Sequence, residues 1–163
     1  MNGVDPERTR FTIPRAVVAQ TEALLAEPGA EGFEGSVLWI GHVNSGAVAE
    51  VTKVHRPEQV AHATPAGLSV TLTESGLTDL IRSLGSDEMV LARLHTHGNG
   101  AVDHSEVDDR NLVVAHPGAV SIVIPWFAAG SIDLAVCGVH VLSAGHRWRR
   151  LSPAETSERF TIR

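Results

Sequence analysis

The sequence predicts one domain of the α/β (α+β) class, in which a mixed β-sheet is flanked by about three helices. A length of 163 residues suits a single domain with a core of ordinary size. Apolar runs typical of strands alternate along the chain with segments whose apolar residues recur at helical spacing. A hydrophobic content of 43% and a charged content of 20% are typical of a soluble globular protein.

The N-terminal half contains two predicted helices, one short predicted strand and three longer ones. Pro14 suits a first helical turn, and apolar residues from Val17 to Leu25 recur at helical spacing, which predicts a helix over 14–27. A second helix is expected at 73–84, capped by Thr73 or Ser75. Apolar or alternating patterns predict the strands, and turn-forming residues separate them. The strands are expected at 11–13, 36–41, 47–55 and 68–72, with a loop at 56–67 between the last two.

The C-terminal half continues the same alternation. The apolar run Met89–Leu94 predicts a buried strand that ends beside two histidines. A third helix is expected to begin near Ser105 and to end before Pro117. Strands are expected at 121–125, 132–142 and 146–151. The domain organisation that follows is a lead-in over 1–10, a domain over 11–151 and a polar tail over 152–163.

Charge and composition exclude several classes of function. A formal net charge of −6 disfavours a nucleic-acid partner, because such proteins usually present a basic surface to phosphates. No apolar run is long enough to span a membrane, and the first residues lack the apolar segment of a signal peptide. Cys137 is the single cysteine and cannot form an internal disulfide, which fits a cytoplasmic location. The pattern leaves the oligomeric state open.

The most informative stretch begins at His95-Thr96-His97 and contains Ser105 and Asp108 downstream. In a strand, side chains two residues apart point to the same side, so both imidazoles can converge on one point. Ser105 and Asp108 are three residues apart at a predicted helix start and share a face. Two imidazoles and one carboxylate suit a zinc ion with an open fourth position. The stretch therefore predicts a catalytic metal site.

Simpler interpretations account for parts of this pattern. Because the chain has nine histidines, an H-x-H pair is expected by chance about half the time. Ser105 with Asp108 also has the spacing of a capping box. The whole conjunction is rarer, roughly one in a thousand for this composition. Asp103 and Asp109 are alternative carboxylate ligands, and His104 is expected to be a surface-loop residue.

These residues resemble the signature of the JAMM (MPN+, JAB domain) metalloprotease family. That signature is an upstream glutamate followed by H-x-H-x7-S-x2-D, and every spaced position is matched here. The family's glutamate opens a strand that has a glycine seven residues later, which Glu34 and Gly41 reproduce and Glu31 does not. The chain departs from the usual pattern at Gly98, where many members have proline, and at His104.

The resemblance implies a JAMM/cytidine-deaminase-like sheet and a set of roles. His95, His97 and Asp108 are then the ligands of one Zn2+ per chain. Glu34 is the general base and Ser105 stabilises the oxyanion. Zinc lowers the pKa of its bound water to about 7 and polarises the carbonyl under attack.

The resemblance also implies a function. The family contains isopeptidases and peptidases that cleave after the C-terminal glycine of a ubiquitin-like protein, in a conjugate or a precursor. Some bacterial members are encoded in ubiquitin-like antiphage defence operons, and others act on a sulfur-carrier protein. A non-catalytic MPN scaffold is a further alternative, although such modules usually lack a ligand. The substrate tail is expected to add as a strand near the loop at 56–67.

Overall fold

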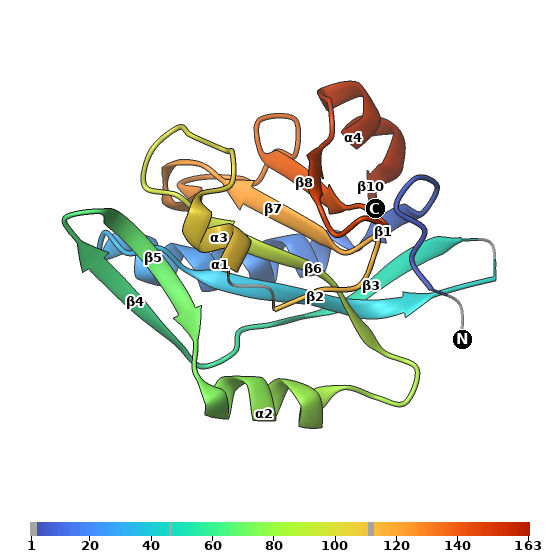
Figure 1. The fold of residues 1–163 in the computed structure, drawn as a ribbon, viewed down its shortest axis with the longest axis horizontal. Helices are drawn as coiled ribbons and strands as arrows, with labels where there is room; N and C mark the ends of the chain where they lie inside the picture. Colours follow the sequence, from blue (N-terminus) through green and yellow to red (C-terminus); the bar gives the residue numbers. More distant parts are fainter. Residues whose placement is uncertain (1–2, 46, 111–112) are drawn as a thin grey trace.

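A computed structural model describes residues 3–45, 47–110 and 113–163 of the chain (Figure 1). Within these residues, an eight-stranded mixed sheet has the strand order β10-β1-β3-β2-β6-β7-β8-β9, and β4 with β5 forms a separate two-stranded sheet. The strands are β1 Arg10–Ile13, β2 Ser36–Val43, β3 Val48–His55, β4 Gln59–Thr64, β5 Gly67–Leu72, β6 Met89–Thr96, β7 Val120–Ile124, β8 Gly138–Leu142, β9 Trp148–Arg150 and β10 Phe160–Ile162. The helices are α1 Arg15–Ala30, α2 Glu74–Ser83, α3 Glu106–Arg110, α4 Pro153–Arg159 and the short 3-10 helix η1 Trp126–Ala128.

The central strand β2 is buried on both faces, which explains its unbroken apolar sequence. Val37 and Trp39 belong to the main core, which also contains the apolar face of α1. Leu38 and Ile40 point the other way and pack with Leu80 of α2. Successive side chains of a strand alternate between faces, so one apolar run supplies two cores. The helices α1 and α2 accordingly lie on opposite sides of the sheet (Figure 1).

The predicted fold class is confirmed, as a single α+β domain with a mixed sheet. The predicted strand over 132–142 is too long, since only Gly138–Leu142 pairs in the sheet. A turn precedes it, in which the Asp133 side chain accepts a hydrogen bond from Ala135 N and the Asp133 carbonyl accepts one from Val136 N. Residues 152–163, to which the pattern assigned no element, form α4 and β10, and β10 pairs with β1.

Two expectations near the candidate site are wrong. The segment 56–67 is not a loop, because β4 pairs with β5 as an antiparallel hairpin from Gln59 to Leu72. The third helix does not run to Pro117: the described part of α3 spans Glu106–Arg110, positions 111–112 lie outside the described residues, and residues 113–117 are not helical. Tertiary packing holds residues 113–117 in a non-helical conformation. Val114 is buried with Leu142, and the His116 ring bonds to the carbonyl of Val90.

Among the described residues, no helix has the length and apolar character needed to cross a membrane.

Candidate metal centre

Strand β6 delivers the two histidines to one point. His95 lies near the end of the pairing between β6 and β7, opposite Val123, and is fully buried. His97 follows the strand, and its N–H donates to the Ile124 carbonyl, which keeps the backbone extended. The two rings share one side of the strand, with centroids 5.1 Å apart. The predicted convergence of the imidazoles is therefore present.

Asp108 of α3 lies between the two imidazoles. Its Oδ1 is 3.1 Å from His95 Nε2 and its Oδ2 is 3.3 Å from His97 Nε2. Ligands of a tetrahedral zinc ion, each about 2.0–2.1 Å from the metal, are about 3.3 Å apart. The Asp108 separations of 3.1 and 3.3 Å match that spacing, and one ligand atom from each of the three residues lies within 4.8 Å of the others.

The hydrogen-bonding state of the rings also fits a metal. His97 Nδ1 lies 2.8 Å from the Ala101 carbonyl and donates to it, so in the neutral ring Nε2 carries the lone pair that a metal would accept. Both ring nitrogens of His95 are buried: Nδ1 has no hydrogen-bond partner among the described residues, and Nε2 faces Asp108 Oδ1 at 3.1 Å. Coordination of a cation would give the buried Nε2 a partner.

The protonation states of His95 and Asp108 suit coordination. Burial lowers the pKa of His95 to about 4, so this imidazole is neutral at pH 7. Burial by itself raises the pKa of Asp108, but its contacts with His95 and His97 outweigh that effect and hold the pKa far below its usual range. A neutral imidazole and an ionised carboxylate are the forms that bind metal.

The β2–β6 register brings Glu34 to the site. Ser36 is opposite His95, and Gly35 exchanges hydrogen bonds with Thr96, its N–H donating to the Thr96 hydroxyl and its carbonyl accepting from Thr96 N. Continuing this antiparallel register places Glu34 opposite His97. Glu34 is 8% exposed. Burial is the main cause that raises its pKa to about 7; Asp108 raises it further, and His97 lowers it.

Ser105 caps α3. Its hydroxyl accepts from Asp108 N at 3.2 Å, and its own N–H donates to Asp108 Oδ2 at 2.8 Å. These are the two reciprocal bonds of a capping box, as the spacing predicted. The Ser105 hydroxyl uses a lone pair in this bond, so its proton remains available as a donor.

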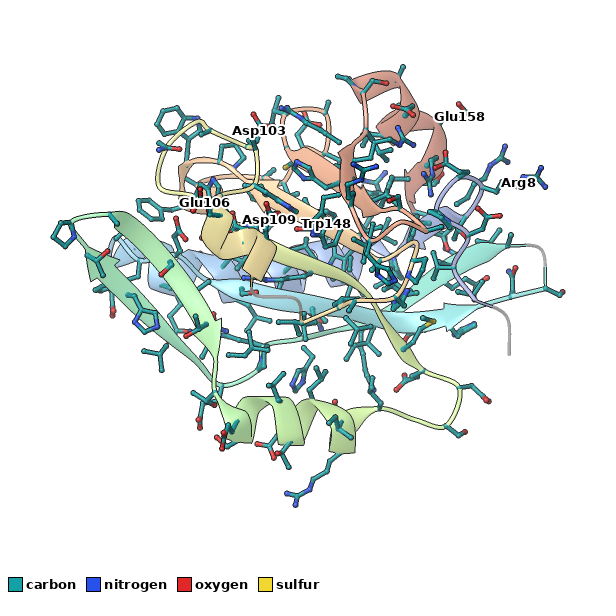
Figure 2. The ribbon with its side chains drawn as sticks, viewed as in Figure 1. Arg8, Asp103, Glu106, Asp109, Trp148 and Glu158 are labelled. Atoms are coloured by element: carbon teal, nitrogen blue, oxygen red, sulfur yellow. The ribbon has the colours of Figure 1, made fainter. Side chains whose placement is uncertain are left out.

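The other charged candidates lie outside the three-residue cluster. Asp109 pairs with His104 and Asp103 pairs with Arg150, while Glu31 is exposed at the end of α1. The expectation that His104 is a surface histidine is wrong, because only 8% of its side chain is exposed. Asp109 and Glu106 of α3 are labelled in Figure 2.

Arg93 is a buried neighbour of the site that the motif did not reveal. It lies on the same side of β6 as His95, two residues earlier, and its Nε donates to the Ser36 hydroxyl at 3.4 Å. Burial lowers the pKa of Arg93, while the charges of Asp108 and Glu34 raise it. The sequence signal was an arginine at a period-2 position inside an apolar strand.

No family model matches the chain. Over 163 residues, the chain is 29% identical to "Probable metalloprotease y4jG" of Sinorhizobium fredii (strain NBRC 101917 / NGR234), and the match covers 99% of each protein. The chain is therefore homologous over its whole length to a protein named as a probable metalloprotease.

Two solved structures share the fold. The solution structure of protein DSY2949 from Desulfitobacterium hafniense has a TM-score of 0.60 and 14% identity, covering 94% of this chain and 92% of that one. The solution structure of a protein from Salinibacter ruber (strain DSM 13855) has a TM-score of 0.55 and 13% identity, covering 86% and 88%. At these identities the likeness concerns the fold alone.

Proposed function

We propose that this chain is a zinc metalloprotease of JAMM type that cleaves after the C-terminal glycine of a ubiquitin-like protein, in a conjugate or a precursor. The observation that carries the proposal is the convergence of His95, His97 and Asp108, with ligand atoms within 4.8 Å of one another and Glu34 beside them. Full-length similarity to a protein named as a probable metalloprotease supports the same class.

Each residue then has a defined role in the proposed reaction. The two imidazoles and the carboxylate would hold zinc, which would supply Lewis acidity for water activation and carbonyl polarisation. Glu34 takes the proton of the attacking water and passes it to the leaving amine, and its burial raises its pKa toward the range that suits both steps. The Ser105 hydroxyl donates to the developing oxyanion while its lone pair caps α3.

The hairpin β4–β5 is the proposed grip for the substrate tail. Within the described residues, the two strands pair only with each other, so each keeps an open edge for strand addition. The hairpin begins at Gln59, whose side-chain amide bonds both the N–H and the carbonyl of Ser36. A groove of about 170 Å³ lies between the hairpin and α1, and Glu34, Gln59 and Ala61 are among its lining residues. A substrate tail that pairs with the open edge of the hairpin beside this groove would reach Glu34, the proposed base.

The test of the function combines cleavage with metal analysis. The substrate is a fusion of a ubiquitin-like protein, encoded by a neighbouring gene, to a reporter after its terminal glycine. Wild type should cleave the fusion and contain about one zinc per chain. Glu34→Gln should retain zinc and lose activity by about 10²–10⁴-fold, the usual range for removal of a general base. His97→Ala should lose both.

Other outcomes distinguish the rival functions. Cleavage of a sulfur-carrier fusion but not of a conjugation-type fusion would assign the second substrate class. Full activity in Glu34→Gln would show that another group is the base. A wild-type chain that binds no zinc would refute the metalloprotease proposal and favour a scaffold module. An antiphage role would require loss of protection in cells that carry the Glu34→Gln variant.

The hairpin has its own test. Shortening β4 and β5 by two residues each removes open edge without touching the metal ligands. We expect KM for the protein fusion to rise far more than kcat falls, while a short peptide substrate is little affected. An equal loss of kcat and kcat/KM on both substrates would contradict strand addition at this edge.

A further inference from the structure

The ring of His104 lies in the interior beside the metal centre. Its side chain is 8% exposed, and its centroid is 6.3 Å from that of His95. The ring stacks on His140 of β8 at 4.1 Å and meets Trp148 of β9 edge-on at 5.1 Å. Figure 2 places Trp148 and Asp109 where α3 meets the C-terminal strands. The residue directly before Ser105 is thus packed between α3 and two strands.

Both ring nitrogens of His104 are engaged. Nδ1 is 3.0 Å from Asp109 Oδ1, and Nε2 is 2.8 Å from the Ser121 hydroxyl on β7. The carboxylate accepts from Nδ1–H, so Nε2 carries the lone pair that accepts the Ser121 proton. The chain Asp109–His104–Ser121 therefore connects α3 with the central sheet.

Two further contacts hold the same segment against the C-terminal strands. Gly138 of β8 allows close approach of the preceding loop, because a Cβ there would lie 1.8 Å from the Val102 carbonyl oxygen. Asp103 pairs with Arg150 of β9 at 2.7 Å. Contacts with β8 and β9 therefore help to hold the segment from Val102 to Asp109 in place.

The short helix needs such support. The described part of α3 has five residues and residues 113–117 are not helical, so α3 is below the length at which a helix is stable in isolation. It nevertheless places the Asp108 oxygens 3.1 and 3.3 Å from imidazoles on a rigid strand. A shift of about 1 Å in α3 would spoil that spacing, because metal sites tolerate errors of about 0.2 Å in ligand distance.

We propose that His104 is a positioning residue that locks Asp108 and Ser105 in register with His95 and His97, by bonding α3 to Ser121 and packing on His140. The inference rests on the proposed metal site. Its physical basis is that residues supporting metal ligands commonly change affinity by about 10–100-fold when they are altered.

An aspartate, histidine and serine bonded in this order also form the triad of serine hydrolases. Here Ser121 is 4% exposed and lies on β7, a strand paired on both sides by β6 and β8. A substrate carbonyl has no approach to its hydroxyl. The arrangement therefore serves the position of α3. Covalent labelling of Ser121 by a fluorophosphonate probe would overturn this assignment.

The experiment measures zinc affinity by competition with a chromophoric chelator, together with the visible spectrum of the Co2+-substituted protein. His104→Ala should weaken zinc binding by about 10–100-fold and alter the cobalt spectrum. His104→Gln, whose amide can reach Ser121, should recover affinity to within about fivefold of wild type. Ser121→Ala, which removes one hydroxyl, should weaken binding by about fivefold and provides the test if His104→Ala does not fold.

His116→Ala is the matched control. The ring nitrogens of His116 lie 2.9 and 3.1 Å from the carbonyls of Val90 and Pro117, and one N–H can donate to either of them, but His116 lies at the far end of β6 from the ligands. We expect it to lower the stability of the zinc-free protein without changing zinc affinity. Wild-type affinity in both His104→Ala and Ser121→Ala would overturn the positioning role. A wild-type chain without zinc affinity, or His97→Ala that binds as wild type, would instead overturn the metal site.

Discussion

Substitution of Asp108 by asparagine isolates the carboxylate of the candidate metal centre. Asparagine keeps the size of the side chain, and its carbonyl can still accept from Ser105 N, so α3 retains its cap. What is lost is the charge that lies 3.1 and 3.3 Å from the two Nε2 atoms. The variant therefore tests coordination rather than packing.

The magnitude follows from linkage between metal binding and folding. Four-ligand structural zinc sites bind with about 10–16 kcal/mol, or about 3 kcal/mol per ligand, so loss of Asp108 should weaken zinc binding by at least about 100-fold. At a free zinc concentration of 100 times the wild-type Kd, zinc stabilises the wild type by about 2.7 kcal/mol and a variant bound 100-fold more weakly by about 0.4 kcal/mol. For a chain of 163 residues this corresponds to zinc-induced Tm shifts of about 5–10 °C and about 1 °C.

The assay is thermal unfolding with zinc and with a chelator, for wild type, Asp108→Asn and Asp79→Asn. Asp79 is an exposed carboxylate of α2 whose ion pair with Arg82 spans 3.9 Å, so its removal should leave the zinc-induced shift unchanged. The shift in wild type should also grow as pH rises, because His97, whose pKa is raised, must lose its proton to coordinate. Equal zinc-induced shifts in wild type and Asp108→Asn would refute coordination by Asp108.

Two more predictions concern the loop and the pH dependence. A Cβ at Gly98 would lie 2.6 Å from the Phe127 ring, so Gly98→Ala should lower the free energy of unfolding in urea by about 1–3 kcal/mol. This loss should largely vanish in a Phe127→Ala background. Additive losses of stability in the double variant would contradict the contact. Burial lowers the pKa of His140 to about 4, whereas an unfolded histidine titrates near 6.5. Between these two pH values the unfolded state therefore binds a proton that the folded state does not. Stability of the zinc-free protein should therefore be complete above about pH 6.5 and fall as the pH drops toward 4, and His140→Gln should flatten that decline; an unchanged slope would contradict the burial argument.

Local patterns predicted the elements because their geometry repeats over a few residues. The period-2 placement of His95 and His97 and the three-residue offset of Ser105 and Asp108 both survive in the folded chain. The patterns failed where side-chain and tertiary contacts overrode them. The predicted helix after Ser105 does not reach Pro117, since Val114 is buried against Leu142, and the apparent loop at 56–67 contains a strand.

By itself, the sequence determined the fold class and the histidine, serine and aspartate positions of the site, because each depends on spacing within one strand or one helical turn. Tertiary structure alone decided how the distant parts meet. The β2–β6 register, through Gly35 and Thr96 61 positions apart, brings Glu34 to His97, and the packing of β7 and β8 buries His104. Pairing between strands and burial of a polar ring depend on the whole sheet, so no local pattern contains them.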